Sequence, residues 1–200
     1  MDWESHYLDN HTPWDKGAAA PPLLEWLEAN PTLISGDILV PGSGKGHDGA
    51  ALAERTAASR VVGLDISPSA AGFANATHQT ERFHTQTGDL FQLPAHHHSA
   101  FDWVWEHTCF CAIDLEMRDA YVEAVHFALK PGGNLLGVFY RNPYDDEHQP
   151  GGGPPHGTSN EEIVSRFVGS GFFEIVESYV PSSSYKGREE LEQLIRMKRL

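Results

Sequence analysis

Long hydrophobic runs are missing from this 200-residue sequence. None approaches the roughly 18 consecutive apolar residues that a membrane-spanning helix needs, so an integral membrane protein of the helical type is excluded. The opening segment Met1–His6 is acidic and polar, which does not match the pattern of a secretory signal. We therefore expect a cytoplasmic protein without a membrane partner.

Positive charge is also scarce. The chain has 14 Lys and Arg residues against 28 Asp and Glu residues, which gives a formal net charge of −14. Binding of nucleic acid is driven by positive side chains on phosphates, so we expect no nucleic-acid partner. A small anionic substrate is not excluded, because charges farther away than about 8 Å are screened at physiological salt.

Cysteine is limited to Cys109 and Cys111. Residues two apart rarely meet the geometry of an unstrained disulfide, so we expect reduced thiols, as in a cytoplasmic protein. The nearby histidines 96–98 and His107 raise the alternative of a metal site. The four-ligand spacing of structural zinc is absent, and we expect no metal. Without a metal, the histidines form a polar loop and the cysteines pack in the apolar core.

What the sequence does contain is an alternation of short apolar runs with helical patterns. The balance of 40% hydrophobic and 21% charged residues is ordinary for a globular domain. Such alternation predicts one α/β domain over residues 1–200, with a mostly parallel, doubly wound, Rossmann-like sheet of seven strands and helices on both faces. The expected strands are 37–40, 60–65, 83–87, 101–105, 134–140, 172–180 and 194–198, and the expected helices are 47–57, one capped by Ser67-Pro68, 115–129 (ended by Lys130-Pro131-Gly132-Gly133) and 161–168.

A glycine-rich loop follows the first expected strand. Its glycines allow a tight turn and bring backbone N–H groups close to a ligand. Gly42 and Gly44 begin a G-x-G-x-G pattern, whereas the dinucleotide fingerprint would need glycine at His47. The P-loop ending is also absent, because Gly46 follows Lys45. A ligand is expected at the switch point in strand order, beyond the carboxyl ends of the strands.

Acidic residues follow the second and third expected strands. Asp65 stands about 20 residues after the glycine loop, where a carboxylate can accept both ribose hydroxyls. Asp89 is placed to accept from an adenine amino group, with Ile66 and Leu90 beside the ring. The alternative for Asp65 is a helix N-terminal acid favoured by the helix dipole. Together with the glycine loop, these acids predict a cofactor that contains adenosine.

The residues just described carry a family resemblance. The segments 39–44 (LVPGSG), 62–67 (VGLDIS), 110–112 (FCA) and 129–133 (LKPGG) resemble the thiopurine methyltransferase superfamily, most of all its halide and thiol methyltransferase branch. Many class I methyltransferases have an acid two residues before the first loop glycine; Val40 stands there, and Val-Pro-Gly is characteristic of this branch. The resemblance covers nearly the whole chain. It implies the class I methyltransferase fold, with S-adenosylmethionine as cofactor and S-adenosylhomocysteine as product.

The N-terminal segment adds to the resemblance. Trp3, Tyr7 and Trp14 match the spacing of the family's aromatic cofactor lid, which we assign to residues 1–17. An aromatic face attracts a sulfonium cation, although these rings can also serve only to pack the N-terminus on the core. The resemblance also places Glu106 and His107 beside the cofactor; His107 stands where the plant branch usually has Tyr.

The resemblance assigns the acceptor side as well. Arg118 matches a family arginine near the substrate, and a solvated helix charge is its alternative role. Phe110, Tyr140 and the loop 141–158 are candidate pocket walls, and Gly153-Pro154-Pro155 matches a family motif. No catalytic base is obligatory, because a halide or hydrosulfide ion needs none; His107 is a possible base for a neutral thiol.

These observations predict a methyltransferase that acts on a small soft nucleophile: a thiol, hydrosulfide or a halide. One alternative acceptor is a bulkier aromatic thiol. A nicotinamide-dependent oxidoreductase is a rival enzyme class, which the G-x-G-x-G spacing and the aromatic N-terminus disfavour. A regulator that binds the cofactor without turnover is the rival outside enzymology. The sequence leaves the oligomeric state and the exact acceptor open.

Overall fold

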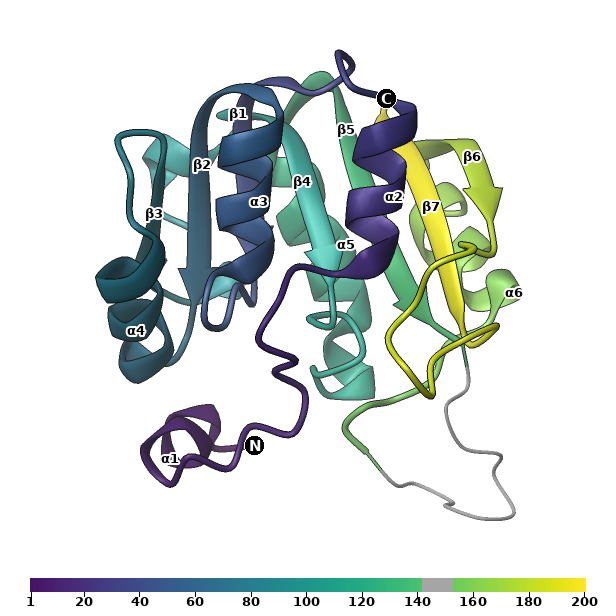
Figure 1. Ribbon diagram of the computed structural model, residues 1–200. Helices are drawn as coiled ribbons and strands as arrows, with labels where there is room; N and C mark the ends of the chain where they lie inside the picture. Colours follow the sequence, from purple (N-terminus) through teal and green to yellow (C-terminus); the bar gives the residue numbers. More distant parts are fainter. Residues whose placement is uncertain (142–152) are drawn as a thin grey trace.

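Seven strands form one sheet in the computed structural model, which describes residues 1–141 and 153–200. The sheet runs through the middle of the molecule (Figure 1). Its order is β3-β2-β1-β4-β5-β7-β6. The strands are β1 (Ser35–Pro41), β2 (Ala57–Asp65), β3 (Phe83–Thr87), β4 (Phe101–His107), β5 (Leu129–Tyr140), β6 (Phe173–Tyr179) and β7 (Glu192–Arg199).

The first five strands are parallel, and the last two make the antiparallel end of the sheet. β1 pairs in parallel with both β2 and β4, while β7 pairs antiparallel with β5 and β6. The strand order therefore reverses between β1 and β4, and this switch point is where α/β sheets bind ligands. The predicted mostly parallel, seven-stranded α/β sheet is confirmed.

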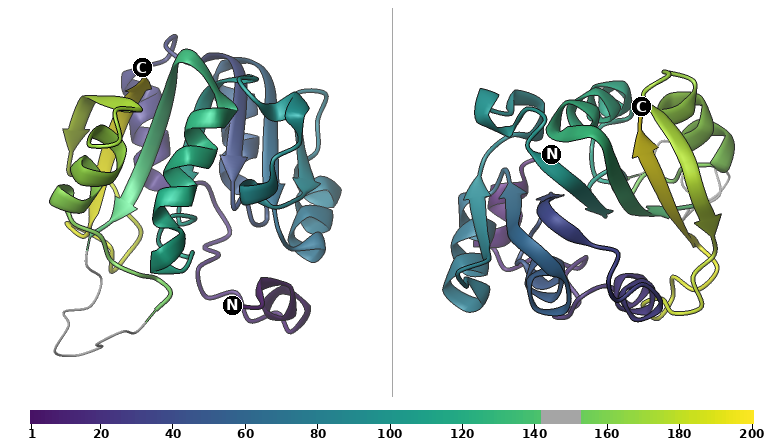
Figure 2. Two further views of the ribbon diagram at one scale, coloured as in Figure 1. Left: turned by 180° about the vertical axis from the view of Figure 1, so that it is seen from behind. Right: turned by 90° about the horizontal axis from the view of Figure 1, so that it is seen from above.

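Helices cover both faces of the sheet. Figure 1 places α2 and α3 in front of the sheet and α5 behind it, and the reverse view in Figure 2 agrees. The helices are α1 (Trp3–Leu8), α2 (Pro21–Ala29), α3 (His47–Arg55), α4 (Pro68–His78), α5 (Arg118–Ala128) and α6 (Asn160–Ile163), with 3-10 turns η1 (Leu90–Gln92), η2 (Ala95–His97) and η3 (Leu115–Met117) and a π-helical turn η4 (Val164–Val168). None of the helices in the described residues is long and apolar enough to cross a membrane.

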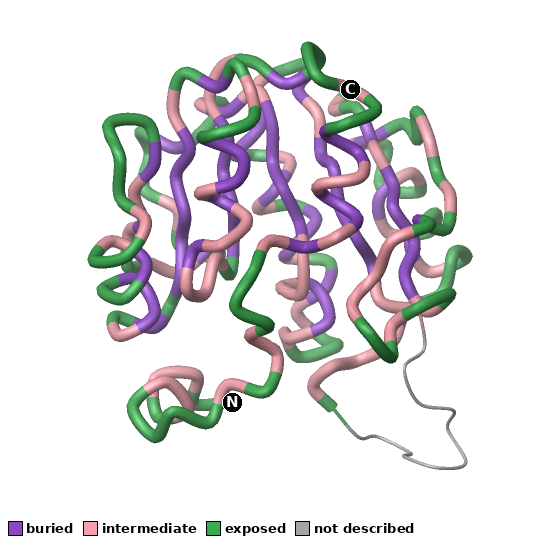
Figure 3. The backbone as a smooth tube through the Cα atoms, in the orientation of Figure 1, coloured by how far each residue is buried: buried purple, intermediate pink, exposed green. Residues whose placement is uncertain are grey.

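The two faces of the sheet make two separate cores. Alternate residues of a strand point to opposite faces, so neighbours in one strand serve different cores. On β4, Val104 packs on the α5 side, whereas Trp103 and Trp105 pack on the side of α2 and α3. Figure 3 shows the buried residues concentrated along the strands and on the inner faces of the helices. This packing fixes the strand ends, where the loops of the site begin.

The boundary between α5 and β5 differs from the sequence prediction. The residues Lys130–Gly133 were expected to follow the helix as a terminator, but they belong to β5, which already begins at Leu129. Leu129 is fully buried and pairs with Phe101 of β4, so the chain enters the sheet directly from the helix. Tertiary burial of Leu129 overrides the local Pro-Gly-Gly pattern. The expected helix 115–129 is correspondingly divided into η3 and α5.

Two helices near the N-terminus have no counterpart in the sequence prediction. α1 contains Trp3 and Tyr7 of the expected lid, and α2 packs on the sheet through Leu23, Trp26 and Leu27. The pattern that predicts α2 is present in the sequence: Pro21-Pro22 suits a first helical turn, and the apolar residues recur at helical spacing. The expected helix 161–168 is divided into α6 and η4.

Candidate functional site

The glycine-rich loop turns sharply between β1 and α3. Gly42, Gly44 and Gly46 have φ values of +58°, +53° and +85°, a region that side chains with a Cβ rarely adopt. A Cβ on Gly44 would lie 3.0 Å from the hydroxyl oxygen of Tyr7. The backbone N–H of Ser43 donates to the carbonyl of Leu64 at 3.1 Å, which ties the loop to the end of β2.

Asp65, the last residue of β2, holds this loop through its carboxylate. One oxygen accepts from the N–H of Gly44 at 2.7 Å, and the other accepts from the N–H of Ser67 at 2.9 Å. Asp65 is only 7% exposed. Burial raises the pKa of its carboxyl, and the charge of Glu4 raises it further, while the two backbone hydrogen bonds oppose the rise. A hydroxyl donor such as a ribose would add hydrogen bonds to this group.

The aromatic N-terminal segment lies over this loop. The indole N–H of Trp14 donates to the hydroxyl of Tyr7 at 3.2 Å, and the rings of Trp3 and Trp14 meet edge to face at 5.2 Å. Burial raises the pKa of Tyr7 to about 12, and the nearby charge of Asp65 contributes to the shift. The three aromatic residues expected in the lid are therefore together, and Tyr7 lies beside both Gly44 and Asp65.

A carboxylate fastens α1 to the N-terminus of α4. Glu4 accepts hydrogen bonds from the hydroxyls of Ser67 and Ser69, the latter at 2.6 Å, and from the backbone N–H of Ser69 at 3.1 Å. The hydrogen bond from Ser67, followed by those from Ser69, lowers the pKa of Glu4. Figure 1 shows α1 beyond the carboxyl ends of the parallel strands.

A second carboxylate fastens the segment that follows α1. Asp15 lies 2.7 Å from the Nζ atom of Lys45 and 3.2 Å from Nε2 of His47, at the start of α3. Glu4 and Asp15 were not identified from the sequence. Acidic side chains in a polar segment are common, and no local spacing marks these as contacts to residues 30 or more positions away.

The residues expected to contact adenine lie just after the ends of β2 and β3. Asp89 accepts from the backbone N–H of Phe91 at 2.9 Å and from the side chain of Gln92 at 3.0 Å, so it caps the turn η1. Ile66 is 56% exposed, whereas Leu90 is 8% exposed and belongs to the core. The roles of these three residues toward adenine stay predictions.

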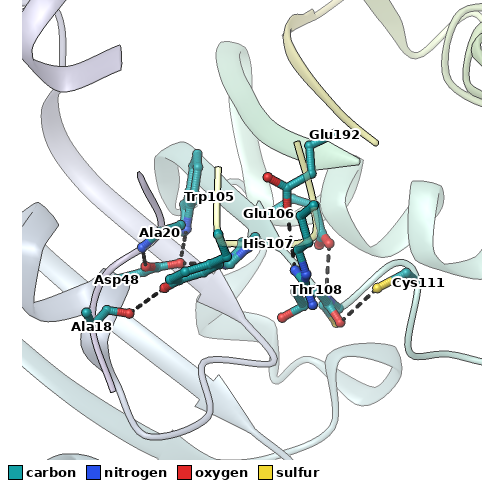
Figure 4. A network of polar contacts seen from close by, with 12 residues as sticks. Ala18, Ala20, Asp48, Trp105, Glu106, His107, Thr108, Cys111 and Glu192 are labelled. Carbon is teal, nitrogen blue, oxygen red and sulfur yellow. Dashed lines mark hydrogen bonds and ion pairs between the residues drawn. The ribbon is translucent and has the colours of Figure 1, made fainter. Parts of the chain in front are cut away.

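At the end of β4, two carboxylates organise the site. Asp48 of α3 accepts from the indole N–H of Trp105 at 2.8 Å and lies 3.0 Å from Nδ1 of His107 (Figure 4). Glu106 is 1% exposed, and its carboxylate accepts from the backbone N–H groups of Cys109 and Phe110 at 3.0 and 2.8 Å. Its other oxygen accepts from the Tyr121 hydroxyl. Glu106 therefore shapes the turn after β4, and its cofactor role stays a prediction.

The residues expected on the acceptor side are not gathered at one surface. Phe110 is 2% exposed and packs on other core aromatics, including Tyr121 at 5.2 Å between ring centroids. Arg118 is 1% exposed; its guanidinium lies over the Phe110 ring at 4.6 Å. The ring of Tyr140 lies 5.0 Å from the guanidinium carbon of Arg188. The expected substrate-side loop 141–158 is described only at residues 141 and 153–158; residues 142–152 lie outside the described residues.

Besides Glu4 and Asp15, sequence reasoning missed two further site residues, Asp48 and Tyr185. Tyr185 stacks on His107 at 6.2 Å between ring centroids and donates its hydroxyl to the carbonyl of Ala18 at 2.6 Å. Asp48 stands in the first turn of α3. Its position four residues after Gly44 is the feature of the sequence that could have identified it as a site residue. Among the described residues, no three His, Cys, Asp or Glu side chains are grouped as a metal site would require.

The residues present fit an adenosylated sulfonium cofactor. The Asp65 carboxylate is buried beside a loop whose positive φ values favour glycine. The hydroxyl of Tyr7, which belongs to the aromatic N-terminal segment, lies against the same loop. A carboxylate suits ribose hydroxyls, and aromatic faces suit a sulfonium cation. The buried hydroxyl of Ser43 has no hydrogen-bond partner in the described part of the chain and lies beside Gly63 of β2, where a Cβ would come within 2.8 Å of it.

Known proteins are similar to this chain over most of its length. The chain is 36% identical over 197 residues to thiocyanate methyltransferase 1 of Brassica oleracea, and the match covers 94% of this chain and 82% of that relative. It is 32% identical over 196 residues to the probable thiol methyltransferase 2 of Arabidopsis thaliana, again over 94% of this chain and 82% of the relative.

A solved structure shares the fold. The Burkholderia thailandensis 1,6-didemethyltoxoflavin-N1-methyltransferase, with bound 1,6-didemethyltoxoflavin and S-adenosylhomocysteine, superposes with a TM-score of 0.70 at 21% identity, over 99% of this chain and 85% of that one. This confirms the predicted Rossmann-like class I fold. The family model for thiopurine S-methyltransferase matches residues 1–192, which confirms the predicted family and enzyme class. The chain therefore belongs to the thiopurine S-methyltransferase family, whose members are methyltransferases that use S-adenosylmethionine.

Proposed function

We propose that this protein transfers a methyl group from S-adenosylmethionine to a small soft nucleophile: a thiol, hydrosulfide or a halide ion. The observation that carries the proposal is the position of Tyr7 beside Gly44 and Asp65, with Trp14 bonded to the Tyr7 hydroxyl. An aromatic cluster and a buried carboxylate therefore meet at one loop. The thiocyanate and thiol methyltransferase relatives support the choice of acceptor.

The residues proposed to hold the cofactor come from four loops and the N-terminal segment. They are Trp3, Tyr7, Trp14, Gly42, Gly44, Asp65, Ile66, Asp89, Leu90, Glu106 and His107. When bound, S-adenosylmethionine supplies an electrophilic methyl group on a sulfonium. Asp65 would accept from the ribose hydroxyls, and the rings of residues 1–17 would act as a lid that excludes water.

Positioning and removal of water are the main tasks of the chain in this reaction. A cationic donor and an anionic acceptor become two neutral molecules, so charge disappears in the transition state and a dry site favours it. The burial that raises the pKa of Tyr7 to about 12 is what such a site requires. The acceptor residues proposed from the family resemblance are Phe110, Arg118 and Tyr140, together with the loop 141–158.

We further propose that the whole chain acts as one domain on a small-molecule acceptor, in the cytoplasm. The two cysteines are free, and Cys111 is buried, which suits a reducing compartment. The net charge of −14 disfavours a nucleic-acid acceptor.

A bulkier aromatic thiol is the second candidate acceptor, because the matching family model is that of thiopurine S-methyltransferase. The purified protein with S-adenosylmethionine is therefore tested by gas chromatography of methylated products, with iodide, thiocyanate, hydrosulfide, methanethiol and thiophenol. We expect the small acceptors to have the higher kcat/KM. A preference for thiophenol above about tenfold would assign the bulky acceptor. Absence of every methylated product, with the cofactor bound, would indicate a regulator.

A further inference from the structure

Asp48 is surrounded by three hydrogen-bond donors, one from the segment before α2 and two from β4. Its Oδ1 accepts from the backbone N–H of Ala20 at 2.7 Å, and its Oδ2 accepts from Nε1 of Trp105 at 2.8 Å and faces Nδ1 of His107 at 3.0 Å. Burial by itself would raise the pKa of Asp48, but the hydrogen bonds from His107, Trp105 and Ala20 hold that pKa below its ordinary value. The carboxylate is therefore ionised at neutral pH and offers only lone pairs.

This contact fixes which nitrogen of His107 carries the proton. An ionised carboxylate can only accept, so Nδ1 of His107 must donate to it, and the neutral ring then has its lone pair on Nε2. That Nε2 atom is buried and has no hydrogen-bond partner within residues 1–141 and 153–200. A buried lone pair without a donor is costly unless a ligand supplies one.

The ring of His107 is also held in place by its neighbours. Tyr185 stacks on it at 6.2 Å and 29°, and Trp105 lies 6.2 Å away on the same strand. The side chain of His107 is 11% exposed. Figure 4 shows the imidazole beside Asp48, at the end of β4. A ring fixed in one orientation with one free nitrogen is what a proton acceptor needs.

His107 belongs to the same edge of the sheet as the glycine loop. It is the last residue of β4, which pairs with β1 immediately before that loop. Two residues further on, Cys109 lies 3.0 Å from the position of a Cβ on Gly42. The free nitrogen is thus among the loops where the cofactor and its acceptor are expected, rather than on a distant surface.

We propose that Asp48 and His107 form a base dyad that makes this enzyme a methyltransferase for thiols that are neutral at working pH; the proposal rests on the proposed function. The S–H proton of the thiol passes to Nε2 of His107 as the sulfur forms its bond to the methyl group. The bond between that methyl group and the sulfonium sulfur breaks with its electron pair, which leaves a thioether. The proton is then released to water. His107 is the catalytic residue, and Asp48 is a positioning residue.

Other charged groups near the dyad are already paired. Glu106, next to His107 in the chain, accepts from Cys109, Phe110 and Tyr121. Near Tyr185, Arg188 pairs with Glu192 at 3.3 Å, and Asp15 pairs with Lys45 and His47. Asp48 is therefore the only carboxylate in the described residues that forms an ion pair or hydrogen bond with His107, which makes it the group to vary.

The test compares a neutral thiol with an anion that needs no base. The kcat/KM values of the full chain for methanethiol and for iodide are measured across pH. We expect His107→Gln to lower the value for methanethiol near pH 7 by about 100-fold, in the range for general-base catalysis, and to lower that for iodide at least tenfold less. In this variant the break between the acid limb and the plateau of the thiol profile should disappear, because the rate should rise in proportion to hydroxide. Asp48→Asn should act in the same direction, and the exposed His96→Gln is the matched control.

The outcomes separate the dyad from the proposed function. Equal losses on both acceptors, or a wild-type enzyme that methylates iodide but not methanethiol, would overturn the dyad. Methylation of neither acceptor would remove the proposed function. Independently of turnover, long-range nitrogen–proton NMR of the ligand-free protein, with His107→Gln for assignment, should find the proton on Nδ1. A proton on Nε2, or a folded Asp48→Asn variant with an unchanged His107 spectrum, would refute the role of Asp48.

Discussion

Replacement of Arg118 separates a structural role from the substrate role that the family resemblance implies. The side chain is 1% exposed, and its Nη1 lies 2.7 Å from the carboxylate of Glu162. Its Nη2 donates to the carbonyls of His156 and Gly157 at 3.1 and 3.0 Å. Arg118 thus connects α5 to α6 and to the end of the loop 153–158, and it packs on Phe110.

Arg118→Met keeps most of the side-chain volume and removes these hydrogen bonds. Loss of one partner of a buried ion pair costs about 3–5 kcal/mol. The lower end applies here, because Glu162 is 25% exposed and keeps hydrogen bonds from Thr158 and Arg166. A loss of about 3 kcal/mol corresponds to a fall in Tm of about 6–12 °C for a chain of this length.

The assay is urea unfolding followed by circular dichroism, with kcat and KM measured below the transition. Arg166→Met is the matched control: Arg166 is 27% exposed and pairs with the same Glu162 and with the exposed Asp119, so about 1 kcal/mol or less is expected. If Arg118→Met unfolds within about 1 kcal/mol of wild type while KM for the acceptor rises, the structural reasoning is refuted and Arg118 acts on the substrate.

Three further predictions concern the cofactor side and acid stability. Asp65→Ala should weaken binding of S-adenosylhomocysteine by about 1.5–3 kcal/mol in calorimetry, since hydrogen bonds to a charged group are lost; unchanged affinity in a folded variant would remove Asp65 from the site. Saturating S-adenosylhomocysteine should slow limited proteolysis near Trp14 by ordering the lid, and equal cleavage rates would contradict a lid. Burial alone would raise the pKa of Glu162, but hydrogen bonds from Arg118, Thr158 and Arg166 hold it below its ordinary value of 4.5. Its ionised form therefore stabilises the fold above pH 4.5, and this stabilisation is lost as pH falls through the lower pKa of the folded state. In urea titrations, Glu162→Gln should reduce the loss of unfolding free energy at acid pH. An unchanged pH dependence would refute the reasoning.

Local sequence patterns determined the fold and the cofactor side. Buried parallel strands appear as short apolar runs, and a ligand loop that needs positive φ requires glycine at set positions, as at Gly42 and Gly44. Asp65 could be predicted to lie beside this loop because it is the last residue of the neighbouring strand. These features are encoded within a few residues, so the sequence alone was enough to predict them. The roles of the individual residues toward a ligand remain predictions.

Element boundaries were decided by packing instead. Leu129 ends a helix by its local pattern, yet the chain there enters β5, because its side chain is fully buried beside Phe101. The local Pro-Gly-Gly preference is weaker than the free energy gained when a leucine is buried, about 1.5–3 kcal/mol.

Only the tertiary structure brought Asp48 to His107. The two residues are 59 positions apart and are common residue types, so no spacing in the sequence links them. Arg118 likewise looks like an exposed helix charge until Glu162 and the carbonyl groups around it are placed. The sequence determined which loops meet at the carboxyl edge of the sheet, because strands that alternate with helices run parallel and end at the same edge. Which side chains touch there depends on the register and packing of distant elements, and that is decided only when the whole core closes.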